Sequence, residues 1–227
     1  MAKGIFITVE GTDGSGKTTQ LAFLREYLEE LGREVLVTRE PGGTPIGEKL
    51  REILLDSANA AMGDRAEVLL YAAARAQHVD ELIRPALERG AVVLSDRFTD
   101  SSIAYQGYGR ELGSVVGEVN AFATDGLKPD ITFFLSLPPA EGRKRMEARA
   151  FDRIESEQLT FHERVYAGYL AAAAAEPERI RVIDASKSIE EVREEIYSAL
   201  DAIFKGASPE EAAETSGEPE DGGRDHA

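Results

Sequence analysis

The chain of 227 residues contains no cysteine and no tryptophan, and it has only three histidines. The absence of cysteine excludes disulfides, thiolate metal sites and a cysteine nucleophile. His78, His162 and His226 stand far apart without metal-ligand spacing, so we treat them as non-catalytic. No apolar run approaches the ~18 residues of a membrane span, and no basic N-terminal region precedes a long apolar segment. We therefore expect a soluble, cytoplasmic protein.

Positive charge is also scarce, with 26 basic residues against 42 acidic ones and a formal net charge of −16. Such a balance argues against sequence-independent binding to nucleic acid or to an anionic membrane. Part of the acidic excess lies after Gly206, where seven acidic residues accompany one arginine. This segment has little apolar surface to bury, so we expect it to be disordered. We predict one folded domain over 1–206 and an acidic tail over 207–227.

One stretch near the N-terminus, from Gly11 to Thr18, has the sequence GTDGSGKT and matches the pattern G-x-x-x-x-G-K-[ST]. It follows an apolar run predicted to be a strand and precedes leucines spaced by three or four, as in a helix. In such a P-loop, backbone N–H groups and the helix N-terminus surround phosphate oxygens. Lys17 would reach the outer phosphates, and the Thr18 hydroxyl would ligate Mg²⁺.

The rest of the chain alternates between predicted strands and predicted helices. Short apolar runs near 5–9, 34–38, 91–97, 131–137 and 180–184 predict five strands. Strands that alternate with helices require right-handed crossovers and a mainly parallel sheet covered on both faces. The sequence therefore predicts an α/β protein with the three-layer P-loop NTPase fold.

Polar residues gather where these strands end, the edge at which open α/β sheets bind ligands. A Gly- and Pro-rich loop over 39–45 follows the second strand, and the third strand ends in Asp96 and Arg97. A carboxylate in that position can hold Mg²⁺ from the side opposite Thr18, and the arginine can neutralise a transferring phosphoryl group.

Three further segments have the side chains of a binding pocket. Tyr71 and Arg75 lie four residues apart on a predicted helix and so share one face. The segment 101–110 surrounds two tyrosines with hydrogen-bonding side chains, which suits a pocket wall better than a surface loop. Five basic residues within eleven positions mark a positive site in an otherwise acidic chain: Arg143, Lys144, Arg145, Arg149 and Arg153.

Taken together and in this order, six segments closely resemble the bacterial thymidylate kinase family, and the likeness covers about residues 4 to 205. The resemblance implies transfer of the γ-phosphoryl group of ATP to dTMP with Mg²⁺, a short mobile lid over about 143–157, and a homodimer. Its motifs are the P-loop, Arg39 to Thr44, Ala72 to Arg75, Asp96-Arg97, Ala104 to Gly107, and Asp152 to Glu155.

The resemblance also implies roles for individual residues. The base of dTMP would stack on Tyr71 and accept a hydrogen bond from Arg75, while Tyr105 would crowd the 2′ position of the sugar. Asp13 would lie near the 3′-hydroxyl and phosphate of dTMP, and Arg97 would bind that phosphate. The expected ATP site is Gly11, Thr12, Asp13, Gly14, Ser15, Gly16, Lys17, Thr18 and Thr19. The expected dTMP site is Asp13, Glu40, Pro41, Tyr71, Arg75, Arg97, Ser102, Tyr105 and Gln106, with Thr18 and Asp96 for the metal.

Catalysis is expected to use Lys17, Asp13, Arg97 and an arginine of the lid. Some members of the family carry an arginine directly after the acid of the P-loop, whereas this chain has Gly14 there. It thus resembles the members that take this cation from the lid. Arg149 and Arg153 are the candidates, with Arg153 preferred because it stands in the matching Asp-Arg-Ile-Glu string.

Other readings of the P-loop remain open. A nucleotide or deoxynucleoside kinase with a different acceptor would share the fold, and phosphorylation of a hydroxyl would need a carboxylate base, for which Glu10 or Glu40 is available. A GTP-driven switch lacks support because the chain has no Asn-Lys-x-Asp string. A non-catalytic scaffold would not need Lys17, Thr18 and Asp96 together.

Overall fold

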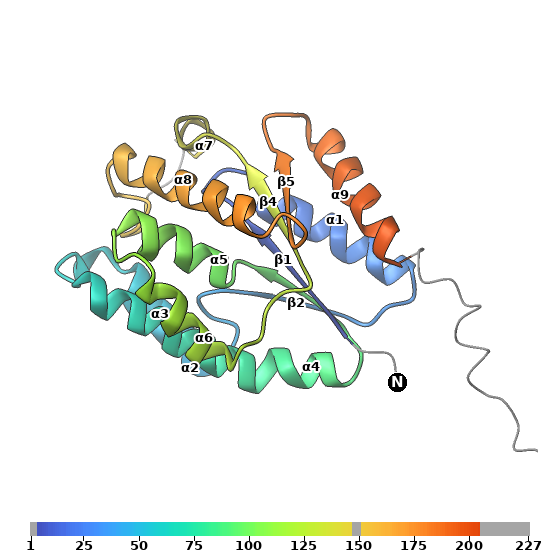
Figure 1. Ribbon diagram of the computed structural model, residues 1–227, viewed down its shortest axis with the longest axis horizontal. Helices are drawn as coiled ribbons and strands as arrows, with labels where there is room; N and C mark the ends of the chain where they lie inside the picture. The colour runs from blue at the N-terminus through green and yellow to red at the C-terminus, as the bar shows by residue number, and fades with distance from the viewer. Residues whose placement is uncertain (1–3, 147–150, 205–227) are drawn as a thin grey trace, which may run out of the picture.

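The computed structural model describes residues 4–146 and 151–204 (Figure 1). Its five strands form one sheet, which is parallel throughout and has the order β2-β3-β1-β4-β5. The strands are β1 Ile5–Glu10, β2 Val35–Arg39, β3 Val92–Asp96, β4 Ile131–Ser136 and β5 Ile180–Asp184. The predicted fold class is confirmed, whereas the predicted tail over 207–227 lies outside the described residues.

Helices follow each strand, as the alternating sequence pattern predicts. The α-helices are α1 Lys17–Glu30, α2 Pro45–Leu55, α3 Asp64–His78, α4 Arg84–Glu88, α5 Thr99–Ser102, α6 Val115–Thr124, α7 Pro139–Arg145, α8 Leu159–Ala175 and α9 Ile189–Phe204. A 3₁₀ turn, η1, spans Ser57–Asn59, and π-helical turns span Val79–Ile83 (η2) and Ile103–Gly109 (η3). No helix of the described part is long and apolar enough to cross a membrane.

The sheet is covered on both faces because its strands are apolar on both faces. On one face, Ile7, Leu94 and Phe133 pack against α1 and α9 in the largest buried cluster. On the other, Phe6 and Val93 pack against η2 and α4, while Phe134 packs against α8. Figure 1 shows α1 and α9 together on one side of the sheet and α3, α6 and α8 on the other. The result is the expected three-layer arrangement.

The strand order determines where the site can form. Because β1 lies between β3 and β4, with Val9 paired to Asp96, the P-loop that follows β1 begins beside the end of β3. Ligands of open α/β sheets bind at such carboxyl ends, where neighbouring connections leave in opposite directions. The fold therefore brings the P-loop, Asp96 and Arg97 together.

Candidate active site

The P-loop connects β1 to α1 and requires glycine at Gly14. Gly14 has φ +80°, and a Cβ atom there would collide with the backbone carbonyl of Gly142 within α7. L-residues rarely adopt such a conformation, so a larger side chain would be both strained and blocked. This close contact accounts for the absence of an arginine directly after Asp13.

Lys17 folds back over the loop that precedes it. Its Nζ donates to the carbonyl oxygens of Gly11 and Thr12, both at 3.1 Å, and lies 3.9 Å from Oδ1 of Asp13. Burial, and after it the positive charge of Arg97, lowers the pKa of Lys17 below its ordinary value. An incoming phosphate would offset both effects by giving the ammonium group an anionic partner.

Arg97 lies at the turn after β3 with φ 72°, in the left-handed region that a bulky residue seldom adopts. The turn is held on both sides, since Ser95 Oγ donates to the Arg97 carbonyl at 2.8 Å and the Phe98 N–H donates to Glu10 at 2.7 Å. The guanidinium group donates to Asp13 Oδ1 at 2.5 Å and lies 5.2 Å from the centre of the Tyr105 ring. Strained backbone that surrounding contacts maintain is common at functional sites.

Asp13 is the carboxylate at the centre of these cations. Burial by itself would raise its pKa, but the charges of Arg97 and Lys17 and a hydrogen bond from Tyr105 outweigh burial and lower the pKa to about 2. Asp13 is therefore ionised at neutral pH, and it orients the arginine that approaches it.

A cavity of about 540 Å³ opens in front of the P-loop, within the usual size range of small-molecule sites. Most residues predicted from the sequence to form the site lie on its wall, but Gly11, Thr12, Ser15 and Arg153 do not. Arg149 lies outside the described residues. The predicted residues that line the cavity are Asp13, Gly14, Gly16, Lys17, Thr18, Thr19, Glu40, Pro41, Tyr71, Arg75, Asp96, Arg97, Ser102, Tyr105 and Gln106.

Thr18 and Asp96 face this cavity from opposite elements. Asp96 Oδ1 is buried and has no hydrogen-bond partner, which is costly for a carboxylate oxygen. The described residues contain no group of three or more His, Cys, Asp or Glu side chains that could hold a metal by themselves. A hydroxyl and a single carboxylate nevertheless fit Mg²⁺ that takes its remaining ligands from phosphates and water.

Arg75 lines the cavity from α3, and its side chain is buried. It donates to Glu40 Oε2 through Nε, to Ser102 and Asn120 through Nη1, and to the Phe98 carbonyl through Nη2, at 2.6–3.0 Å. An arginine has five N–H groups, so these four bonds leave one hydrogen on Nη2 for a ligand. The position suits a donor to a base carbonyl.

Arg153 does not reach the cavity in this structure. Its Nε donates to the Leu54 carbonyl at 2.7 Å, and its Nη1 lies 2.8 Å from Oε2 of Glu67. Both side chains of this ion pair are almost fully buried. A phosphate could meet Arg153 only after this pair had separated, so its role as the cation of the lid stays a prediction.

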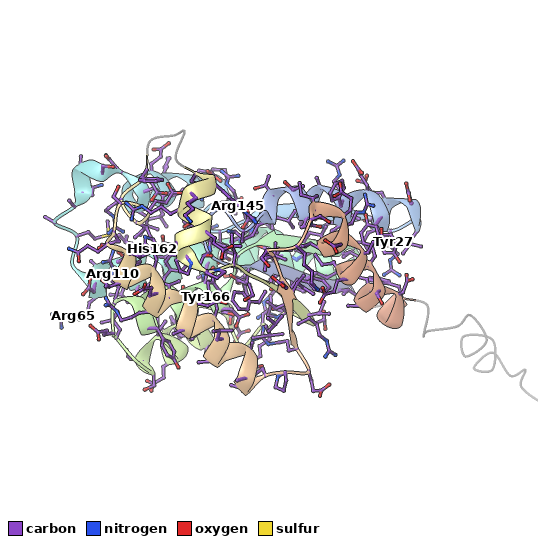
Figure 2. The ribbon with its side chains drawn as sticks, turned by 90° about the horizontal axis from the view of Figure 1, so that it is seen from above. Tyr27, Arg65, Arg110, Arg145, His162 and Tyr166 are labelled. Carbon is purple, nitrogen blue, oxygen red and sulfur yellow. The ribbon has the colours of Figure 1, made fainter. Side chains whose placement is uncertain are left out.

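Sequence analysis missed several residues that line or support the cavity. Arg145 donates to the Gly14 carbonyl at 3.4 Å and to the Ala185 carbonyl at 3.2 Å, and Figure 2 shows it beside the start of α1. In the sequence, the signal for Arg145 was its place within the cluster of five basic residues. Arg51, which lines the wall, and Asn120, which binds Arg75, gave none.

The parallel sheet, the P-loop and the nucleotide-sized cavity define a protein of the P-loop nucleotide-binding class. Residues 9–196 match the thymidylate kinase family. A thymidylate kinase of Clavibacter sepedonicus is 54% identical over 209 residues, which cover 90% of this chain and 99% of that protein. One of Exiguobacterium is 53% identical over 195 residues, covering 85% of this chain and 92% of that protein.

A solved structure agrees with these sequence relatives. The crystal structure of thymidylate kinase from Ehrlichia chaffeensis has a TM-score of 0.70 and 35% sequence identity, and the match covers 87% of this chain and 99% of that one. The chain therefore belongs to the thymidylate kinase family.

Proposed function

We propose that this protein transfers the γ-phosphoryl group of ATP to dTMP, giving dTDP. The observation that carries the proposal is that one cavity, in a member of this family, is lined both by groups suited to phosphate and by groups suited to a base, which we assign to its two ends. Lys17 and Arg97 supply the first end, whereas Tyr71, Arg75 and Gln106 supply the second. A nucleotide with its base at the second end would direct its phosphate towards the P-loop.

The chemistry requires alignment and positive charge rather than a base. The phosphate of dTMP is already an anion and can attack the γ-phosphorus without losing a proton. Lys17 and the P-loop amides hold the donor phosphates, and Arg97, oriented by Asp13, holds the acceptor phosphate. These cations neutralise the charge that develops on a loose, metaphosphate-like transition state.

Mg²⁺ is the metal that we assign to Thr18 and Asp96. The unpartnered Oδ1 of Asp96 supports this assignment, since hard oxygen ligands suit this ion. When bound, the ion supplies further positive charge to the donor phosphates.

The rival assignment, a kinase that phosphorylates a nucleoside hydroxyl, needs a carboxylate base, and the two candidates for it are already engaged. Glu10 does not line the cavity, and it accepts hydrogen bonds from Phe98, Ser101 and Tyr169. Glu40 lines the cavity, but its two oxygens bind Arg75 and His78. Neither carboxylate is placed to take a proton from an acceptor hydroxyl.

The test is a screen of acceptors with ATP and Mg²⁺, measured as ADP release. We expect turnover with dTMP and none with thymidine, and the Lys17→Ala variant serves as the inactive control. Turnover with thymidine, or a purine monophosphate used better than dTMP, would refute the proposal.

We further propose that the protein acts in the cytoplasm, where ATP and nucleotides are plentiful. We also propose that two copies associate through α2, α3 and α6. These helices pack together (Figure 1) and expose large apolar side chains: Ile46, Ile53, Leu69, Val115 and Phe122, the last 90% exposed. Soluble proteins seldom expose clustered apolar groups without a partner. Sedimentation should show a dimer that Leu69→Glu dissociates, whereas Leu170→Glu, a change at an exposed leucine of α8, leaves it intact.

A further inference from the structure

Glu67, on α3, does not line the cavity, yet it contacts three residues from two other segments. It is completely buried. Its Oε1 accepts from Gln106 Nε2 at 2.9 Å and from Arg110 Nε at 3.3 Å. Its Oε2 lies 3.0 Å from Arg110 Nη2 and 2.8 Å from Arg153 Nη1. Each oxygen thus has two donors, which uses the full accepting capacity of the carboxylate.

The ionised state of Glu67 follows from these partners. Burial alone would raise its pKa, but hydrogen bonds from Arg110, Gln106 and Arg153 outweigh burial and lower the pKa below its ordinary value. An ionised carboxylate can only accept hydrogen bonds. Gln106 must therefore turn its NH₂ group towards Glu67, which removes the usual ambiguity about how a glutamine amide is oriented.

This orientation has a consequence for the cavity, because Gln106 lines its wall. The two arms of a planar amide diverge, so with the nitrogen held by Glu67 the oxygen is the arm left for a ligand. An amide oxygen accepts from the N3–H of thymine or uracil. Cytosine carries a lone pair and no hydrogen at N3, so the amide oxygen would face another acceptor and be repelled by it.

We propose that Glu67 is a positioning residue for specificity: it fixes the amide of Gln106 so that the site selects pyrimidine monophosphates carrying an N3–H and rejects cytosine. The inference rests on the proposed function and concerns its acceptor. The spare N–H of Arg75 supports the same choice, since it requires a carbonyl on the base and not an amino group.

Replacement of Glu67 by glutamine tests this arrangement directly. The contacts at Oε2, from Arg110 at 3.0 Å and Arg153 at 2.8 Å, favour an oxygen there. The new NH₂ group would then take the place of Oε1, where it faces Gln106 and gives up only the longer 3.3 Å contact with Arg110 Nε. Gln106 would then turn its own oxygen towards position 67 and present its NH₂ group to the cavity. That group donates, which suits the N3 of cytosine.

The experiment compares kcat/KM for dTMP, dUMP and dCMP with ATP, and also measures dCMP as a competitive inhibitor of dTMP. In Glu67→Gln we expect the preference for dTMP over dCMP to fall about tenfold or more. The preference for dTMP over dUMP should not change, since both bases carry the N3–H. A loss of packing alone would not separate these two ratios.

Glu157→Gln is the matched control, because Glu157 also binds Arg110, at 2.5 Å, but not Gln106 or Arg153. It should leave both ratios unchanged. An unchanged dTMP to dCMP ratio in folded Glu67→Gln, or an equal fall in Glu157→Gln, would overturn the proposal.

The remaining outcomes are also decisive. If Glu67→Gln does not fold, Gln106→Met replaces it: a fall in the dTMP to dCMP ratio supports the role of the amide, and no change overturns it. If the unmodified protein does not phosphorylate dTMP, the proposed function fails, and this inference fails with it. A protein that is active on dTMP but gives unchanged ratios refutes the role of Glu67 alone.

Discussion

The two ends of the cavity use arginine and carboxylate pairs in opposite ways. At the phosphate end, Arg97 pairs with Asp13, and both side chains line the cavity. At the base end, Arg153 pairs with Glu67 behind the wall, and neither lines the cavity, unlike the pair that Arg75 forms with Glu40. The first pair keeps part of its surface accessible, at 17% and 20%, whereas the second is nearly or fully buried, at 6% and 0%.

This difference separates two tasks that charge can perform in one site. A pair that faces a cavity can exchange partners with an incoming phosphate, so its cation acts on the reacting atoms. A buried pair cannot do so without leaving a charge unpaired in the interior, which is expensive. We therefore expect substitutions at the phosphate end to lower kcat, and substitutions at the base end to change acceptor recognition or stability.

Arg97→Ala should have the largest effect. It removes the cation that holds the acceptor phosphate, and kcat should fall by about 10³-fold, in the range found when one group that stabilises developing charge is lost. Steady-state kinetics with dTMP measures the effect, and Arg97→Lys, which retains charge without the fork of N–H groups, should recover only part of the loss. A variant with more than a tenth of the normal kcat would remove Arg97 from the mechanism.

The next largest effects are expected at the two arginines of the predicted lid, and they should differ in kind. Because Arg153 is engaged by Glu67 and the Leu54 carbonyl, we now expect Arg149→Ala to lower kcat by about 10²-fold, since Arg149 is the remaining candidate for the cation from the lid. Arg153→Ala should instead lower the free energy of unfolding by about 3 kcal/mol, the typical cost of breaking a buried pair.

Turnover and urea unfolding, measured on both variants, test this assignment. A loss of kcat in Arg153→Ala, with stability intact, would restore the role that the sequence favoured for that residue. It would also show that the buried pair opens during the reaction.

The elements and site residues that local patterns define were predictable from the sequence. The glycine spacing predicts the P-loop, apolar runs predict the five strands, and residues after the strand ends, such as Asp96 and Arg97, lie where parallel sheets bind ligands. The strand order was not predictable in this way, because it depends on how crossovers pack in three dimensions and not on any one segment.

Glu67 shows why the buried residues behind the cavity wall escaped prediction. In the sequence it is an acidic residue in the first turn of a helix, a position where carboxylates are common and exposed. Its burial depends on Arg110, 43 residues later, and on Arg153 beyond that. The ion pair of Arg153 escaped prediction for the same reason: its sequence motif was visible, but its partner Glu67 was not.

The pH dependence of stability should come from Glu10, which lies beneath the phosphate end. Burial, and then the nearby charge of Asp100, raises its pKa from 4.5 to about 7, against hydrogen bonds from Ser101 and Phe98 and the charge of Arg97. The unfolded chain releases this proton at lower pH than the folded protein does. Stability should therefore fall as pH rises from about 4.5 to about 7, and then level off.

Glu10→Gln should remove this trend. One pKa unit corresponds to about 1.4 kcal/mol, so the stability of the variant relative to the parent should improve by up to about 3 kcal/mol across that range. Urea unfolding of both proteins at pH 5, 6 and 7.5 measures the difference. A gap that stays constant with pH would mean that Glu10 is ionised in the folded protein throughout.

The smallest effect should be the preference between dTMP and dUMP, which differ by one methyl group. Apolar side chains, among them Leu55 and Ile154, lie on the cavity wall with Tyr71, and a methyl group in such contact contributes only ~1–3 kcal/mol to discrimination. We expect kcat/KM to favour dTMP by roughly tenfold, mostly through KM, because the methyl group is remote from the reacting phosphates. Equal kcat/KM values would show that the base does not bind at this end. A difference confined to kcat would break the division between the two ends, since it would mean that contacts with the base act directly on phosphoryl transfer.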